Sequence, residues 1–367
     1  MNNAVLVENK QYDIIVLGII RKKLVKKVIY FCIYMKIEGE KRSMQLTLDL
    51  NKNGNYDTEL YNLIANIPEN FRLYYPEHKL DTPLGIYNTS IERVLKAFEE
   101  IVKNLNINYL KHLNDNCWET ISSNHKELLD SIMSFIDDGY HIMKCFYAKS
   151  EVTANIIFAD KWLEQINRAM IQNYKRNIKP YREKLAVIDN KIKHNHARYY
   201  NVECYHRFSE NISSRSVGYY IGGIDENGTT MPDEDIHPLF NGKKTAISYN
   251  KDIPRLLANV YYISYYTAHV IGQIIYSQNN QTPINMEKKQ SGFSERFENI
   301  FKQVNSIKKF YFPDEYNGSL TEFVIEDGSI IIRHASNQYL RKLYKPTTFE
   351  LGQISRVGYA KSIQVVY

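Results

Sequence analysis

The sequence has little cysteine, and its four cysteines lie far apart. Cys32, Cys117, Cys145 and Cys204 form no Cys-x-x-Cys pair, the spacing typical of zinc ribbons and thiol redox centres. Scattered cysteines in a chain of 367 residues indicate free thiols in a reducing compartment. We therefore expect a cytoplasmic protein without a disulfide framework.

Long apolar runs are absent as well. Two runs occur early, Ile14 to Ile20 and Val28 to Met35, and lysine and arginine residues separate them. Each is far shorter than the ~20 residues that a membrane helix needs, and no cleavable signal sequence precedes them. We expect a soluble protein with no membrane partner. The runs suggest buried strands, although a helix over 12–37 fits the same apolar and basic pattern.

Signatures of several enzyme classes are missing too. The chain has no Walker A loop, no Gly-x-Gly-x-x-Gly after a strand, no Gly-x-Ser-x-Gly elbow and no zinc deaminase pattern. Pro232-Asp233 and Pro313-Asp314 begin like a metal-dependent nuclease motif, but no acidic-x-Lys strand follows either of them closely. The sequence thus predicts no cofactor and leaves open whether the chain is an enzyme.

The charge is mildly basic, with a formal net charge of +6 and a pI of about 8.8. This balance permits an RNA or DNA partner without requiring one. The 30 tyrosines accompany abundant lysine, asparagine and isoleucine, which is typical of an AT-rich genome. Tyrosine richness is therefore no sign of base stacking in this chain.

Hydrophobic patterning predicts an α+β protein in three parts. Residues 1–88 form a β-rich N-terminal portion, in which 44–50 is one expected strand. A central helical bundle spans 89–307 and carries a β and loop insertion at 201–250. Residues 308–367 form a β-rich C-terminal portion with a small sheet.

Helix boundaries come from capping and breaking residues. Thr89-Ser90-Ile91-Glu92 is a capping-box pattern, so the first long helix is expected to begin there. Pro180 suits a first helical turn, and Asp252 is placed to cap the helix that follows it. Further helices are predicted over 118–147, 152–175, 180–198, 253–277 and 294–307.

Turn signals place the remaining segments. Asp327-Gly328 between two apolar runs predicts a β-hairpin, and strands over 347–358 and 361–367 are expected to complete the C-terminal sheet. The segment 225–243 contains two glycines and two prolines among few apolar residues. We expect it to form a mobile surface loop.

The stretch Asp189 to Arg207 holds the candidate site. It combines three histidines, one cysteine and several basic residues at the expected end of a helix. The helical repeat places Asn195 on the buried face and points Lys193 towards solvent. The candidate catalytic residues are His194, Asn195, His196 and His206. The candidate nucleic-acid-binding residues are Lys191, Lys193, Arg198 and Arg207.

These residue types suit cleavage of RNA without a metal. Such cleavage needs a histidine that titrates near neutral pH to move a proton, and cations that hold the phosphate. A zinc site built from the same histidines and Cys204 is disfavoured, because ligands two apart on a helix diverge by about 200°. We therefore expect no metal. In the simplest alternative, the basic residues are a solvated helix face and the histidines cap its end.

The run Asn190-Lys-Ile-Lys-His-Asn195 within a helical bundle resembles the Lys-His and Asn-x-x-x-His signatures of HEPN-type proteins. The resemblance covers about 90–275 at the level of fold and six residues at the level of motif. It implies a bacterial toxin or phage-defence protein, often a metal-independent endoribonuclease that acts as a homodimer. The chain departs from the usual Arg-polar-x(3–5)-His motif, since Tyr181 and Arg182 follow Arg176-Asn177 where a histidine belongs.

The functional hypothesis is thus a bacterial cytoplasmic defence or toxin protein that engages RNA or another nucleic acid through the basic tip of its bundle. The alternative is a non-catalytic interaction or regulatory subunit of a defence complex. Such a subunit would bind a protein partner through exposed β edges and the 225–243 loop.

Overall fold

In the computed structural model, the described residues all lie within Met35–Tyr367. They are 45–49, 55–67, 75–108, 115–194, 197–209, 212–224, 230–233, 235–237, 239–240, 243–244, 246–278, 284, 287, 289–312, 314–315, 319–326, 329–336 and 348–354. The predicted strands before 44, the ambiguous segment 12–37 and the predicted strand 361–367 lie outside the described residues.

Helices and strands alternate in blocks along the chain. The helices are α1 (Glu59–Ile64), α2 (Pro83–Asn108), α3 (Asp115–Lys144), α4 (Ala159–His194), α5 (Tyr249–Gln278) and α6 (Ser294–Ser306), with 3-10 turns η1 (Pro76–His78) and η2 (Lys149–Glu151). The strands are β1 (Gln45–Asp49), β2 (Tyr199–Ser209), β3 (Ile212–Ile224), β4 (Thr230–Pro232), β5 (Leu239–Phe240), β6 (Lys243–Lys244), β7 (Ile247–Ser248), β8 (Ser319–Glu326), β9 (Ser329–Ser336) and β10 (Thr348–Ile354). The predicted α+β class with a central helical bundle is confirmed.

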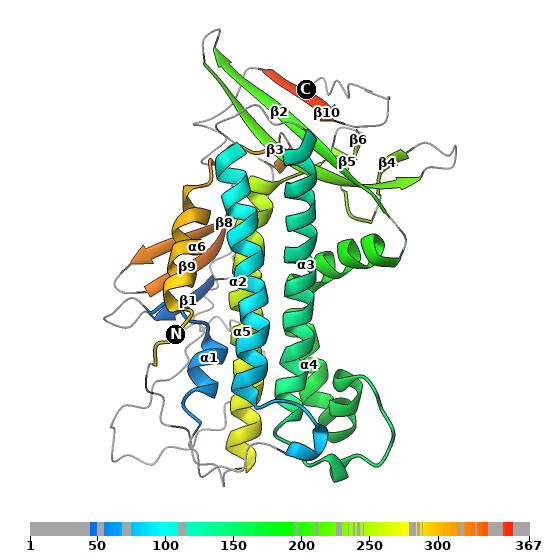
Figure 1. The fold of residues 1–367 in the computed structure, drawn as a ribbon, viewed down its shortest axis with the longest axis vertical. Coiled ribbons are helices and arrows are strands. Elements are labelled where there is room, and N and C mark those ends of the chain that lie inside the picture. The colour runs from blue at the N-terminus through cyan, green and yellow to red at the C-terminus, as the bar shows by residue number, and fades with distance from the viewer. Residues whose placement is uncertain are drawn as a thin grey trace, which may run out of the picture. The chain divides into compact units, whose positions relative to one another are not determined.

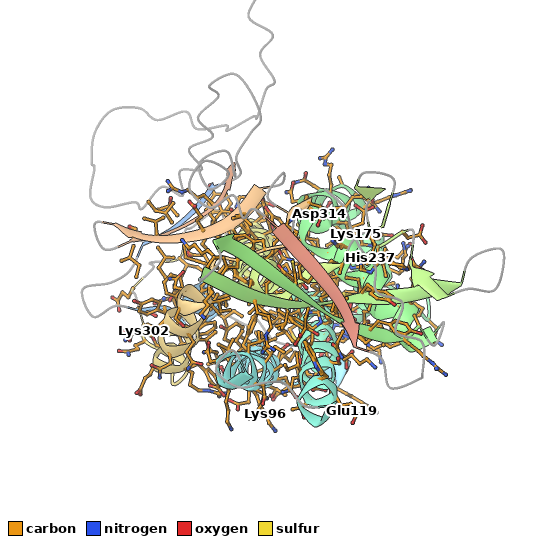
Figure 2. The ribbon with its side chains drawn as sticks, turned by 90° about the horizontal axis from the view of Figure 1, so that it is seen from above. Lys96, Glu119, Lys175, His237, Lys302 and Asp314 are labelled. Carbon is orange, nitrogen blue, oxygen red and sulfur yellow. The ribbon has the colours of Figure 1, made fainter. Side chains whose placement is uncertain are left out.

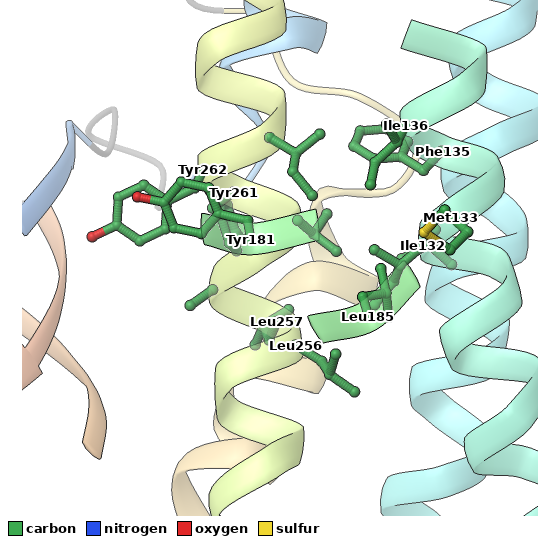
Figure 3. Close-up of a cluster of buried hydrophobic side chains, with 14 of the residues drawn as sticks. Ile132, Met133, Phe135, Ile136, Tyr181, Leu185, Leu256, Leu257, Tyr261 and Tyr262 are labelled. Atoms are coloured by element: carbon green, nitrogen blue, oxygen red, sulfur yellow. The ribbon is translucent and has the colours of Figure 1, made fainter. Parts of the chain in front are cut away.

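The long helices pack side by side and the β2–β3 pair lies across one end of them (Figure 1). Figure 3 shows side chains that fill the centre of the bundle, among them Ile132 and Ile136 of α3, Leu185 of α4, and Tyr181 and Tyr262. Tyr181 of α4 stacks on Tyr262 of α5 with ring centroids 4.5 Å apart. Burying a side chain of this size stabilises the fold by about 1.5–3 kcal/mol, so this core fixes α4 against α5.

The first long helix begins earlier than its sequence pattern indicates. α2 starts at Pro83 rather than at Thr89. The hydroxyl of Thr82 accepts a hydrogen bond from the backbone N–H of Gly85 at 3.1 Å, which is the role of an N-cap residue. Proline suits the first helical position because its missing N–H would have no partner there. Thr82 and Pro83 therefore displace the expected capping box.

The break in α4 also lies elsewhere than predicted. Pro180 does not begin a new helix, because α4 continues through it from Ala159 to His194. The non-helical residue is Asn167, with φ −144° and ψ 82°. Its side-chain oxygen accepts a hydrogen bond from the N–H of Met170 at 3.0 Å and so caps the second segment.

Strands from distant parts of the chain pair with one another. The hairpin β8–β9 forms where it was predicted, and β1 pairs antiparallel with β9, with Leu46 opposite Ile332. The expectation that 347–358 completes this sheet is wrong. β10 pairs instead with β2, with Leu351 opposite Cys204. β2 thereby lies between β10 and β3.

The expectation of a mobile loop over 225–243 is wrong for its middle. β4 pairs with β3, and the side chains of Ile236 and His237 are buried. His237 (Figure 2) accepts a hydrogen bond on Nε2 from the backbone N–H of Ile221 at 2.8 Å. This segment is therefore packed onto the strand β3.

Candidate functional site

Lys191, in the last turn of α4, is held by two carboxylates. Its ammonium lies 2.6 Å from a carboxylate oxygen of Asp233 and 2.6 Å from one of Asp235. The backbone N–H of Asp233 donates in turn to the carbonyl of Ile221 in β3 at 2.8 Å. Lys191 thus ties the end of α4 to the segment that follows β4.

Lys193 is paired as well. Its ammonium contacts Asp130 of α3 and lies 3.1 Å from Asp189, one turn earlier in α4. The Lys193 and Asp130 side chains are 43% and 46% exposed, so this pair contributes little to stability. The two predicted phosphate-binding lysines together face four carboxylates. Their charge is therefore already compensated within the molecule.

Two other cations near the end of α4 are unpaired within the described part of the chain. Arg198 is exposed, and its carbonyl accepts a hydrogen bond from the N–H of Gly222 in β3 at 2.9 Å, which fixes its backbone. Lys126 of α3 is also exposed, and its ammonium lies 5.2 Å from the ring centroid of Tyr199, the neighbour of Arg198. Arg198 and Lys126 are the cations left available for an anion.

The predicted catalytic residues are spread along the chain's path from α4 into β2. His194 is the last residue of α4, and Asn195 and His196 lie outside the described residues. His206 and Arg207 lie within β2, where His206 stands opposite Ser214 of β3. At about 3.3 Å per residue, β2 carries His206 roughly 25 Å from Arg198. The structure therefore does not bring His206 and Arg207 to the end of α4.

A buried polar network, missed by the sequence analysis, joins the bundle to the sheet. The ring of His125 in α3 is fully buried; its Nε2 lies 3.1 Å from Asp252 in α5 and its Nδ1 lies 3.0 Å from the hydroxyl of Tyr199 in β2. Tyr219 of β3 donates its hydroxyl proton to Asp252 at 2.7 Å. Arg255 donates to the other oxygen of Asp252 from Nε at 3.0 Å and also from the guanidinium nitrogen Nη2. The network connects two helices and two strands.

The network exists because Asp252 does not cap its helix. α5 begins at Tyr249, earlier than predicted, and the hydroxyl of Ser248 accepts the N–H of Lys251 at 3.3 Å as the cap. Asp252 is therefore free to turn inward. Burial alone would raise the pKa of Asp252, but the guanidinium of Arg255 and the hydrogen bond from His125 hold it well below its usual range.

The arrangement of this network suits packing rather than chemistry. Both ring nitrogens of His125 are engaged, and its side chain is 0% exposed. A proton carrier must reach its substrate, and His125 reaches only residues of its own chain. The sequence contains one sign that His125 is buried. It stands four residues from both Ile121 and Leu129, on the apolar stripe of α3.

Glu315 forms a second buried link at the start of α5. Its carboxylate accepts hydrogen bonds from the N–H of Ser248 at 3.0 Å, from the hydroxyl of Ser248 at 2.5 Å and from the N–H of Phe312 at 2.9 Å. Burial raises the pKa of Glu315 to about 7, with Lys251 opposing the shift and Asp314 adding to it. This carboxyl therefore gains a proton on folding at mildly acidic pH.

The raised pKa of Glu315 predicts a pH-dependent stability. The ordinary value is 4.5 and the folded value is about 7, so the contribution is complete below about pH 4.5 and is lost as the pH rises through about 7. Glu315→Gln should remove this dependence. We expect the stability of the wild type relative to that variant to fall by on the order of 2 kcal/mol between about pH 5 and pH 8. Urea unfolding of the wild type and of Glu315→Gln at each pH measures the difference between their free energies of unfolding. Groups that titrate in both proteins affect both values equally, so they do not change this difference. A difference that stays constant between about pH 5 and pH 8 would show that Glu315 does not titrate in this range.

Within the part of the chain that the structure describes, no three His, Cys, Asp or Glu residues gather as a metal site, and none of the described helices has the length and apolar character to cross a membrane. Comparison with protein-family models, with curated proteins and with solved structures finds no match to this chain. Function is therefore inferred from the residues of this chain alone.

Proposed function

We propose that the protein engages RNA or another nucleic acid at the end of α4, as a bacterial cytoplasmic protein of the defence or toxin type. The supporting observation is a pair of exposed cations that have no ion-pair partner within the described residues: Lys126, whose ammonium lies over the ring of Tyr199, and Arg198, the residue before Tyr199. Cations that no carboxylate compensates are the groups that hold phosphates. Lys191 then fixes the end of α4 to the segment after β4, and the charge of Lys193 is compensated by Asp130 and Asp189.

Metal-independent cleavage of RNA, which the HEPN resemblance implies, belongs to the same proposal. His196 precedes Arg198 by two residues and His194 precedes it by four. Both are close enough along the chain to act on a phosphate that Arg198 holds. Loss of these histidines should then abolish cleavage and spare binding, because a general base contributes little to the grip on phosphate.

The test is the double variant Lys126→Ala, Arg198→Ala with single-stranded RNA. Two lost phosphate contacts should lower the log–log salt slope of the binding constant by about 1.4. The loss of affinity should be similar for different RNA sequences, because charge does not read bases. A matched control is Lys96→Ala, Lys103→Ala, which removes two exposed charges from α2 (Lys96 is labelled in Figure 2). Equal affinities of the two variants and the wild type at matched salt would contradict the proposal.

A protein partner is the second candidate, and one observation favours it. Ile157 and Phe158, directly before α4, are 85% and 71% exposed. The carbonyl of Phe158 nevertheless accepts the N–H of Trp162 at 2.9 Å, so the pair is held in place. Large exposed apolar side chains on an ordered segment are typical of contacts between proteins. Unchanged RNA binding in the double variant would favour this second function, that of a non-catalytic interaction subunit.

A further inference from the structure

The helices α4 and α5 run antiparallel, and this brings cations from both together. The hydroxyls of Tyr174 in α4 and Thr267 in α5 are 2.9 Å apart. Further along α4, the carbonyl of Tyr181 accepts a hydrogen bond from Asn259 at 3.0 Å. One more turn along α4 leads to Lys184, and one more turn back along α5 leads to position 255. Lys184 therefore comes opposite that turn of α5.

Three cations meet at this place. Arg255 lies opposite Lys184, and Lys251 precedes Arg255 by four residues, so the two share one face of α5. Two acids act on Lys184, Asp252 and Glu315. Glu315 accepts from Ser248 and Phe312, and the carboxylate of Asp252 already accepts from His125, Tyr219 and twice from Arg255. A carboxylate offers about four acceptor positions. Asp252 thus has none left for Lys184 or Lys251.

The electrostatics of Lys184 reflect this imbalance. Burial lowers the pKa of Lys184 to about 8, and Arg255 and Lys251 lower it further than Asp252 and Glu315 raise it. Within the described residues, the ammonium of Lys184 has no hydrogen-bond or ion-pair partner. A charge held under these conditions is destabilising until an anion compensates it.

The cluster is open to solvent on one side. Lys184 and Lys251 are half-buried, and the side chain of Arg255 is 21% exposed. We propose that Lys184, Lys251 and Arg255 form a binding site for a phosphate dianion, either inorganic phosphate or the phosphate of a small nucleotide. A doubly charged anion matches the two lysines, for which Asp252 has no acceptor position left, and a guanidinium suits phosphate geometry. None of these residues belongs to the end of α4, so the site is independent of the nucleic-acid contact proposed above.

The experiment is the thermal stability of the full chain in inorganic phosphate, matched for ionic strength with chloride. Phosphate at about 100 times its dissociation constant should stabilise the wild type by about 2.7 kcal/mol, seen as a raised Tm. Lys184→Gln should melt at or above the wild-type temperature without phosphate, because it removes a strained charge, and should lose the phosphate response. Lys179→Gln is the matched control on the exposed side of the same helix and should keep the response.

Dependence on pH gives a second readout. Sulfate keeps its double negative charge between about pH 7 and pH 9. Any change in sulfate affinity over this range therefore comes from groups of the protein that titrate. Since the pKa of Lys184 is about 8, the binding constant should fall by about tenfold between about pH 7 and pH 9. Ionisation of Glu315 also adds negative charge near Lys184, so the sulfate titration is repeated with Glu315→Gln. In this variant the binding constant should still fall as the pH rises through 8.

Adenosine monophosphate and inorganic phosphate compared by calorimetry identify the source of the anion. A nucleotide that binds at least tenfold more tightly than phosphate would assign the site to nucleotides, and equal affinities would assign it to free phosphate. The proposal is overturned if phosphate, sulfate and nucleotide all leave the Tm of the wild type unchanged, or if Lys184→Gln responds as the wild type does. Binding of single-stranded RNA by Lys184→Gln should be unchanged, which separates a failure of this site from a failure of the contact at Arg198.

Discussion

Replacing Asp252 by alanine is expected to lower the free energy of unfolding by about 3–5 kcal/mol. The carboxylate is the common acceptor of His125, Tyr219 and Arg255, and it is 1% exposed. Its removal leaves the partly buried guanidinium of Arg255 without its counter-charge and two buried donors, on His125 and Tyr219, without an acceptor. Urea unfolding followed by circular dichroism measures the loss.

The matched control is Asp235→Ala, because Asp235 also accepts from a cation but its side chain is 71% exposed. This variant should unfold at nearly the same urea concentration as the wild type, since exposed ion pairs contribute little to stability. In Asp252→Ala, hydrogen exchange should increase first in β2 and β3, which the network holds to the helices. If both variants unfold at the same urea concentration, the network does not stabilise the junction between sheet and bundle.

Replacing Gly218 by alanine is expected to lower the free energy of unfolding by about 3 kcal/mol, which is at the upper end of the range for substitutions that overpack a core. A Cβ built at Gly218 would lie 2.1 Å from the carbonyl oxygen of Ile247 and 2.7 Å from the ring of Phe312. Gly218 pairs with Ser248 in β7, directly before α5. Because the contact is with backbone, β3 or the start of α5 must move to admit a methyl group.

The control for this substitution is Gly272→Ala in α5. A Cβ there meets nothing within 4 Å, and alanine in a helix is favoured over glycine by about 0.5–1 kcal/mol. The two changes are chemically identical, so they should shift the unfolding midpoint in opposite directions. Equal shifts would mean that the close approach of β3 to Ile247 does not constrain residue 218.

The fold was predictable where periodicity and turn chemistry act locally. The apolar repeat that contains His125 and Leu129 marks α3, and Asp327-Gly328 marks the β8–β9 hairpin. Boundaries were less predictable because several residues compete to cap one helix. Thr89 and Asp252 each carry a capping signal, yet Thr82 and Ser248 occupy the capping positions.

The candidate site was only partly predictable. The sequence shows that Lys191 and Lys193 are basic and near the end of a helix, which holds in the structure. It does not show that Asp130, 63 residues before Lys193, provides the opposing charge. Charge compensation between distant residues depends on packing, so a basic stretch is a weak guide to a free basic surface.

The α+β class, the amphipathic faces of the helices and the presence of the C-terminal hairpin follow from the sequence alone, because each depends on neighbouring residues. Three features depend on tertiary packing: β10 pairs with β2, His125 meets Asp252 across 127 residues, and Lys184 lies opposite Arg255 with no acceptor for its ammonium among the described residues. Pairings of this kind arise when helices and sheets bury their apolar faces together. Their partners are set by the geometry of that packing rather than by any local pattern.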